Sequence, residues 1–174
     1  MICSWQPLCV YCSEEFMLEY DVKITDKELY DYMMVHSYNG APGILGSCLG
    51  ALMVVVALMN GHWIYLICGV VLLLYLPINL RIKSKQQILN NPSFREPLHY
   101  KLDEEGITIS QGEQSQSQKW SDMYKAISTS KSIIVYTSKV SATIFPRKQL
   151  DGDVVKVIEM ISTHMPPGKV KIRY

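Results

Sequence analysis

Residues 43–80 read GILGSCLGALMVVVALMNGHWIYLICGVVLLLYLPINL, and this stretch decides the fold. No Asp, Glu, Lys or Arg lies between positions 37 and 80, although 19% of the whole chain is charged. The stretch divides into two apolar runs, residues 43–59 and 63–80. As helices these runs would rise about 26 and about 27 Å, which is close to the roughly 30 Å core of a bilayer. The sequence therefore predicts two transmembrane helices and excludes a purely cytosolic protein.

A tight turn joins the two runs. Residues 60–62 (NGH) leave room only for a helical hairpin, whereas one continuous helix would overshoot the bilayer core about twofold. Arg81, Lys83 and Lys85 follow the second run directly, and the turn has no Lys or Arg. Because these residues accumulate on the cytoplasmic side of membrane proteins, we expect a multi-pass protein of the cell membrane with both termini in the cytoplasm.

Small residues form a stripe on the first run. Gly46 and Gly50 make a G-x-x-x-G motif, which lets another helix approach closely. The partner helix could belong to a second copy of the chain, giving a homo-oligomer. Folding the hairpin at the turn instead places Gly50 opposite about Leu72 and Gly46 opposite about Leu76, and we favour this packing within the hairpin. Neither run contains a charged residue, which argues against an ion or proton path.

The residues before the hairpin predict one strand and one helix. Residues 16–24 alternate between apolar and polar, which indicates a strand with one buried face. Residues 25–28 (TDKE) match a capping box, in which Thr25 and Glu28 bond each other's backbone N–H groups. We expect a helix to begin there and to reach His36, whose place on the apolar face favours a packing role over a catalytic one.

The residues after the hairpin predict a β domain. Residues 81–91 should continue the second helix until Pro92 stops it, and the apolar pattern then changes to a period of two. Strands are predicted at 98–102, 107–110, 114–120, 123–128, 132–137 and 141–145. The polar composition of residues 114–120 suggests an edge strand. A final helix, capped by Asp151 or Asp153, should end at about His164.

The predicted class is therefore an α+β membrane protein. Six antiparallel strands closed by one α-helix, with residues 16–24 as a possible seventh strand, have the element order of a pleckstrin-homology-like barrel. A plain antiparallel sheet under one helix is the alternative. The expected division is an N-terminal extension (1–16), a strand and amphipathic helix (17–40), the hairpin (41–80), a helical linker (81–91), the β domain with its helix (92–165) and a tail (166–174). Residues 1–16 lack a structural pattern, and we expect the native start at Met17.

Several segments resemble the YcxB-like family. They are YDVKIT (20–25), the pair of spans, LDEEGI (102–107), KWSDM (119–123) and YTSKVSATIFPRK (136–148). The resemblance covers residues 20–164. It implies a small two-span membrane protein of bacteria, in the inner membrane, with a pleckstrin-homology-like C-terminal domain. The family has no established biochemical function, so the resemblance implies no mechanism.

Composition and motifs exclude several functional classes. The net charge of +1 combines −5 over residues 1–36 with +6 over residues 81–174, which is too weak and too scattered for nucleic acid binding. The chain has 5 cysteines, but the C-x-x-C at positions 9–12 has no second pair, so we expect neither a metal nor another cofactor. No nucleophile, phosphate-binding or zinc-protease motif is present, and we do not expect an enzyme.

The function that remains is a membrane-anchored interaction module. The β domain would bind a cytoplasmic protein, a peptide or anionic lipid headgroups at the inner leaflet, in addition to the anchoring bilayer. Candidate contacts are Arg147 and Lys148, with Trp120 and Tyr136 as aromatic anchors. The competing interpretation buries Trp120 in the core and leaves the basic pair in a solvated loop. An alternative function is an accessory or regulatory subunit of a membrane transporter or sensor, acting through the hairpin.

Overall fold

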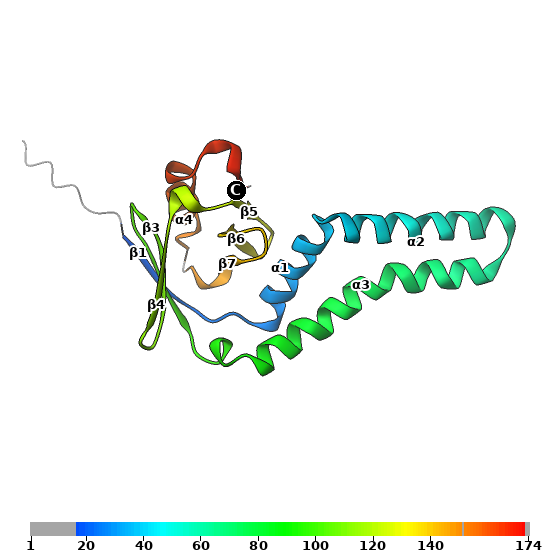
Figure 1. The fold of residues 1–174 in the computed structure, drawn as a ribbon, viewed down its shortest axis with the longest axis horizontal. Coiled ribbons are helices and arrows are strands. Elements are labelled where there is room, and N and C mark those ends of the chain that lie inside the picture. Colours follow the sequence, from blue (N-terminus) through cyan, green and yellow to red (C-terminus); the bar gives the residue numbers. More distant parts are fainter. Residues whose placement is uncertain (1–16, 151, 173–174) are drawn as a thin grey trace, which may run out of the picture.

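The computed structural model describes residues 17–150 and 152–172, and the predicted extension 1–16 lies outside them. The molecule is elongated, with a β domain at one end and a helical hairpin at the other (Figure 1). The first elements are β1 (Leu18–Val22), α1 (Asp26–Tyr38), α2 (Ala41–Asn60) and α3 (Trp63–Asn90). The structure is therefore α+β, as the sequence predicted.

The hairpin consists of α2 and α3, joined at Gly61, whose φ of 70° allows the sharp turn. Both helices are long and apolar enough to cross a membrane, by length and composition. The side chains Leu45, Leu58 and Ile64 are among the many apolar groups that the hairpin leaves exposed. The helix continues past residue 80, so the predicted extension over residues 81–91 is confirmed almost to its end.

Glycine brings α2 and α3 together at one point. A Cβ atom on Gly50 would lie 2.9 Å from Leu73 Cγ, and a Cβ atom on Gly69 would lie 2.8 Å from the Gly50 carbonyl oxygen. The predicted packing of Gly50 within the hairpin is confirmed. A Cβ atom on Gly46 would meet no atom within 4 Å, so its predicted contact with Leu76 is wrong. The reason is that the two helices separate toward the β domain (Figure 1).

Helix α1 connects the hairpin to the β domain. The predicted capping box at Thr25 and Glu28 is present. Arg81 of α3 lies 3.4 Å from the Asp26 carboxylate and 5.3 Å from the centre of the Tyr30 ring. These contacts hold α1 against the end of α3 that emerges from the apolar segment.

The β domain contains two four-stranded sheets. Sheet A has the order β1-β2-β3-β4, with β2 at Leu98–Leu102, β3 at Gly106–Gln111 and β4 at Gln114–Lys119. Sheet B has the order β7-β6-β5-β8, with β5 at Lys125–Ser128, β6 at Ser132–Tyr136, β7 at Ala142–Pro146 and β8 at Val170–Lys171. The six predicted strands, the seventh from the N-terminus and the edge position of β4 are confirmed. A single covered sheet is not observed, and β8, which runs parallel to β5, was not predicted.

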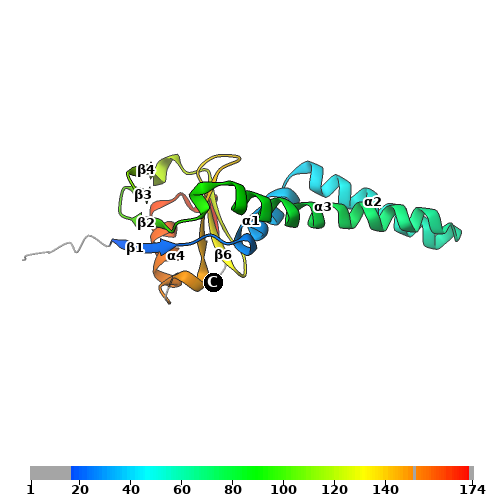
Figure 2. The ribbon, with the colours of Figure 1, turned by 90° about the horizontal axis from the view of Figure 1, so that it is seen from below.

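The two sheets and α4 (Val154–His164) enclose one apolar core. Figure 2 shows the strands of sheet A stacked beside α4 and sheet B. The rings of Tyr100 from sheet A and Phe145 from sheet B meet edge to face at 5.1 Å. Asp153 stands at the start of α4, but its carboxylate makes no cap and bonds Lys156 and Tyr20 instead. Asp153 therefore occupies the predicted N-cap position without a side-chain capping hydrogen bond, and Asp151 lies outside the described residues.

Replacing Gly50 by Leu should destabilise the hairpin, whereas Gly46→Leu should not. A leucine side chain at position 50 would overlap Leu73 and the Gly69 carbonyl, and overpacking of this kind costs about 1–3 kcal/mol. Thermal unfolding of the detergent-solubilised protein, followed by circular dichroism, measures the difference. Equal melting temperatures for the two variants would contradict the crossing at Gly50.

Candidate functional site

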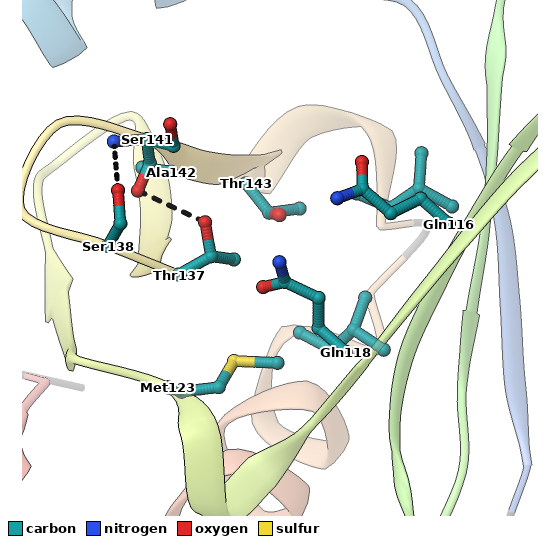
Figure 3. A pocket seen from close by; sticks show the side chains of 10 residues that line it. Gln116, Gln118, Met123, Thr137, Ser138, Ser141, Ala142 and Thr143 are labelled. Atoms are coloured by element: carbon teal, nitrogen blue, oxygen red, sulfur yellow. Dashed lines mark hydrogen bonds between the residues drawn. The ribbon is translucent and has the colours of Figure 1, made fainter.

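The β domain has an open cleft of about 300 Å³ between its two sheets. Sheet A contributes one wall through β3 and β4, and the β6–β7 turn with the start of β7 contributes the other (Figure 3). Met123 lies at its base, between η2 (Trp120–Asp122) and β5. The lining residues are Ile107, Ile109, Gln116, Gln118, Met123, Thr137, Ser138, Ser141, Ala142 and Thr143. The cleft is therefore built from segments distant in sequence.

Polar residues line the sheet A wall where a core strand would carry apolar ones. Gln116 pairs with Ile109 and Gln118 with Ile107, so these four side chains share one face of the sheet. The opposite face of the same strand carries Ser117, whose hydroxyl accepts a hydrogen bond from Thr108. In Figure 3 both glutamine side chains extend from β4 toward the other wall. The glutamines therefore line this part of the space between the sheets with polar amide groups.

Hydrogen bonds within the β6–β7 turn shape the second wall. The Ser138 hydroxyl accepts from the Ser141 N–H at 3.0 Å, and the Thr137 hydroxyl donates to the Ser141 carbonyl at 3.3 Å. The Tyr32 hydroxyl donates to the Val140 carbonyl at 3.0 Å, which ties the turn to α1. The wall that faces the glutamines is therefore fixed in place and presents hydroxyl groups.

The cleft is electrically neutral. None of its lining residues, all of which are described, is charged. Amides and hydroxyls can both donate and accept hydrogen bonds, and Ile107, Ile109 and Met123 add apolar surface. The lining therefore suits an uncharged ligand with hydrogen-bonding groups and does not suit an anion.

Trp120 is an interior residue rather than a surface anchor. It is 3% exposed, its indole N–H donates to the Asp103 carbonyl at 2.8 Å, and its ring stacks on His164 at 5.8 Å. The structure therefore bears out the competing interpretation, in which Trp120 is buried in the core, and not the role of an exposed contact. The physical reason is that β4 ends at residue 119, and the following 3-10 turn directs Trp120 inward against α4.

Tyr136 is also buried and is 1% exposed. Its ring lies 5.9 Å from that of Tyr32 and 6.1 Å from that of His36, and the Lys125 ammonium lies 4.6 Å from its centre. Within the described part of the chain its hydroxyl has no hydrogen-bond partner. Tyr136 therefore packs α1 against sheet B, and its predicted role as an exposed anchor is wrong. His36 packs there too, as expected.

Arg147 and Lys148 begin the short turn η3 (Arg147–Gln149) after β7. The Arg147 N–H donates to the Lys131 carbonyl at 2.9 Å, and its side chain is half-buried, whereas Lys148 is exposed. Neither residue lines the cleft. The structure therefore does not bring the four predicted contacts together into one surface.

The glutamines of the cleft were missed because a sequence pattern does not reveal which face of a polar strand is the inner one. The available signal was the alternation of Gln and Ser over residues 114–118, next to a strand with Ile107 and Ile109 on one face. Pairing that strand with β3 would have placed the glutamines beside the isoleucines.

The structure predicts that Tyr136→Phe is tolerated and alters alkaline stability. Removing a buried hydroxyl without a partner should leave the free energy of unfolding unchanged or higher by about 1 kcal/mol. Burial, with a smaller contribution from charge on Tyr32, raises the pKa of Tyr136 from 10.0 to about 12. The stability that this neutral phenol contributes is therefore present below pH 10 and is lost as the pH rises through 12.

The measurement is thermal unfolding of both full-length proteins in detergent between pH 8 and about pH 12. The Tyr136→Phe variant should lose less stability than the native protein across the alkaline part of this range. A parallel decline in both would contradict the assignment.

Comparison with known proteins gives one match. No curated protein and no solved structure matches the chain. The family model described as YcxB-like protein matches residues 102–161, which run from the end of β2 into α4 and include every residue that lines the cleft. Over these residues the chain matches the YcxB-like family, which is the family that the sequence resembles.

Proposed function

We propose that this protein is a membrane-anchored interaction module, in which α2 and α3 span the membrane and the β domain binds a polar, uncharged polypeptide segment in its cleft. The neutral cleft between β4 and the β6–β7 turn carries this proposal. A polypeptide backbone offers donors and acceptors without net charge, which matches walls of amides and hydroxyls. An anionic lipid headgroup would need cationic partners, which this lining does not provide.

The pairing of β1 with β2 supports the anchored topology. These strands flank the hairpin in sequence and lie antiparallel, with Tyr20 opposite Tyr100. Both ends of the hairpin must therefore return to the same side of the membrane, which two spans achieve. Arg81, Lys83 and Lys85 at the end of the second span favour the cytoplasm as that side. Two sheets and a C-terminal helix around one core are compatible with a pleckstrin-homology-like barrel.

Cysteine labelling tests this topology. In a variant with the natural cysteines replaced by serine, Asn60→Cys at the hairpin turn should react with a membrane-impermeant maleimide from outside intact cells. Lys139→Cys in the exposed β6–β7 turn should react only after permeabilisation. Labelling of Lys139→Cys in intact cells would place the β domain outside and overturn the orientation.

Photo-crosslinking tests the cleft. Ser141 lines the cleft and is exposed, whereas Lys139 is exposed on the same turn and does not line it. A photoreactive phenylalanine analogue at position 141 should form a polypeptide adduct in native membranes, and the same group at position 139 should not. Mass spectrometry identifies the adduct, and a lipid adduct at position 141 would overturn the polypeptide proposal.

Variants of the two faces of β4 provide the control for that experiment. Gln116→Ala with Gln118→Ala removes both amides from the cleft and should reduce the adduct at least about tenfold, on the scale of two lost hydrogen bonds. Ser115→Ala with Ser117→Ala changes the opposite face and should leave it unchanged. Equal effects of the two pairs would contradict the proposed site.

A second candidate function is an accessory subunit that binds another membrane protein through the hairpin. The supporting observation is that Gly46 lies open beside the packed Gly50. Because Gly46→Leu should keep the hairpin intact, loss of a stoichiometric partner in this variant alone would favour this function over the cleft.

A further inference from the structure

Four strands form the edges of the two sheets, and three of them are protected against pairing with another strand. Strand β1 carries Glu19 and Asp21, and past its end the Lys23 backbone exchanges two hydrogen bonds with the Gln149 side chain. Strand β8 has only two residues, and β7 ends at Pro146. Short length, charge and proline are the usual devices that prevent edge-to-edge association.

Strand β4 has none of these devices along most of its length. It has six residues, Gln114–Lys119, without proline, and only the last is charged. Residues 114–117 are exposed, and within residues 17–150 and 152–172 no strand pairs with the side of β4 that faces away from β3. This edge is therefore long, regular and accessible.

The register with β3 determines which backbone groups point outward from this edge. Trp120 continues the β3–β4 register, and its N–H donates to the Glu105 carbonyl at 3.1 Å. Because hydrogen-bonded and non-hydrogen-bonded residues alternate in an antiparallel pair, the even-numbered residues of β4 bond β3. The N–H and C=O groups of Ser115 and Ser117 therefore point away from β3, toward any strand added at this edge.

The sequence of this edge is complementary to itself. Residues 114–118 read QSQSQ, which is the same in both directions, and Glu113 and Lys119 flank it with opposite charges. We infer that a second copy of this chain pairs antiparallel along β4, with a two-fold axis at Gln116. Gln116 then faces its own copy, Ser115 faces Ser117, and Glu113 lies opposite Lys119 at both ends.

This register satisfies both the backbone and the charges. Ser115 and Ser117, which carry the outward N–H and C=O groups, become hydrogen-bonded partners, and Gln116 forms the non-hydrogen-bonded pair on the axis. The two ends each bring an acid opposite a base, which stabilises cross-strand pairs. Because a two-fold interface uses the same patch on both copies, a palindromic strand matches it. The two A sheets would then form one eight-stranded sheet, since each contains four strands.

The orientation of sheet A permits this pairing between two copies in one membrane. Figures 1 and 2 show sheet A lying across the long direction of the hairpin, with β4 at its lateral edge. The two-fold axis of an antiparallel edge pair is perpendicular to the sheet and therefore runs along the hairpin direction. Both hairpins then point the same way. This step rests on the proposed membrane anchor, whereas the pairing itself does not.

Disulfide cross-linking tests the register in the full-length protein with its natural cysteines replaced by serine. In a non-hydrogen-bonded pair the two Cα atoms lie about 4.5 Å apart, which a disulfide can bridge. Gln116→Cys should therefore give an oxidised dimer, both in membranes and in mild detergent. Gln114→Cys is the matched control, because residue 114 of one copy would lie opposite residue 118 of the other. The two cysteines would then be four residues, or about 13 Å, apart along the strand.

A charge exchange tests the same interface without cysteine. Lys119→Glu places like charges opposite Glu113 at both ends and should weaken the dimer about tenfold in sedimentation or mass photometry. Adding Glu113→Lys restores opposite charges and should restore the dimer. Because both positions are exposed, these variants should fold as the native protein does.

Three results would overturn the inference. The first is a protein that is monomeric at all concentrations in detergent and gives no cross-link at position 116 in membranes. The second is equal cross-linking at positions 114 and 116, and the third is a double charge exchange that does not restore the dimer. Dimer formation in detergent depends neither on membrane orientation nor on a cleft ligand. The cleft proposal and the dimer can therefore fail separately, because the adduct at position 141 reports only the first.

Discussion

The antiparallel pairing of β1 with β2 is the constraint on which the architecture depends. Residues 18–22 find their partner only at residues 98–102, and everything between them is a loop inserted into sheet A. That loop contains the charge-free segment, which forms α2 and the first part of α3. Because β1 and β2 are antiparallel, the insertion starts and finishes at the same end of sheet A, and the helical hairpin of α2 and α3 meets this requirement. One pair of strands thus ties the hairpin to the β domain at both ends.

Local patterns predicted the elements of this fold well. The capping box at Thr25 and Glu28, the turn at Gly61 and the alternating strands each depend on residues close in sequence, and each is present where expected. The failures involve relationships between elements. The divergence of α2 and α3 that leaves Gly46 open is a relationship between two helices, which the pattern within either helix does not determine. The strand β8 was missed because two residues are too few to form a pattern.

The candidate site was less predictable than the fold, for a related reason. The sequence leaves both an exposed and a buried position open for Trp120, because the exposure of Trp120 and Tyr136 depends on where β4 ends and where α1 docks. Large aromatic side chains are generally buried in small domains, because few other residues fill a core so effectively. From its polar composition, the sequence predicts for β4 only a position at the edge of a sheet. Its register with β3 makes one face a wall of the cleft and leaves its backbone edge available.

The long insertion between β1 and β2 also has a consequence for how the chain folds during synthesis. During synthesis β1 has no pairing partner in sheet A until the ribosome has reached β2, which begins at residue 98. Until then the apolar side chains of Leu18, Tyr20 and Val22, which are buried in the folded protein, remain exposed. Closing a loop of this length is an entropic cost that local hairpins such as β3–β4 avoid. Incorporation of β1 into sheet A therefore requires that the whole insertion, including α2 and α3, has already been synthesised.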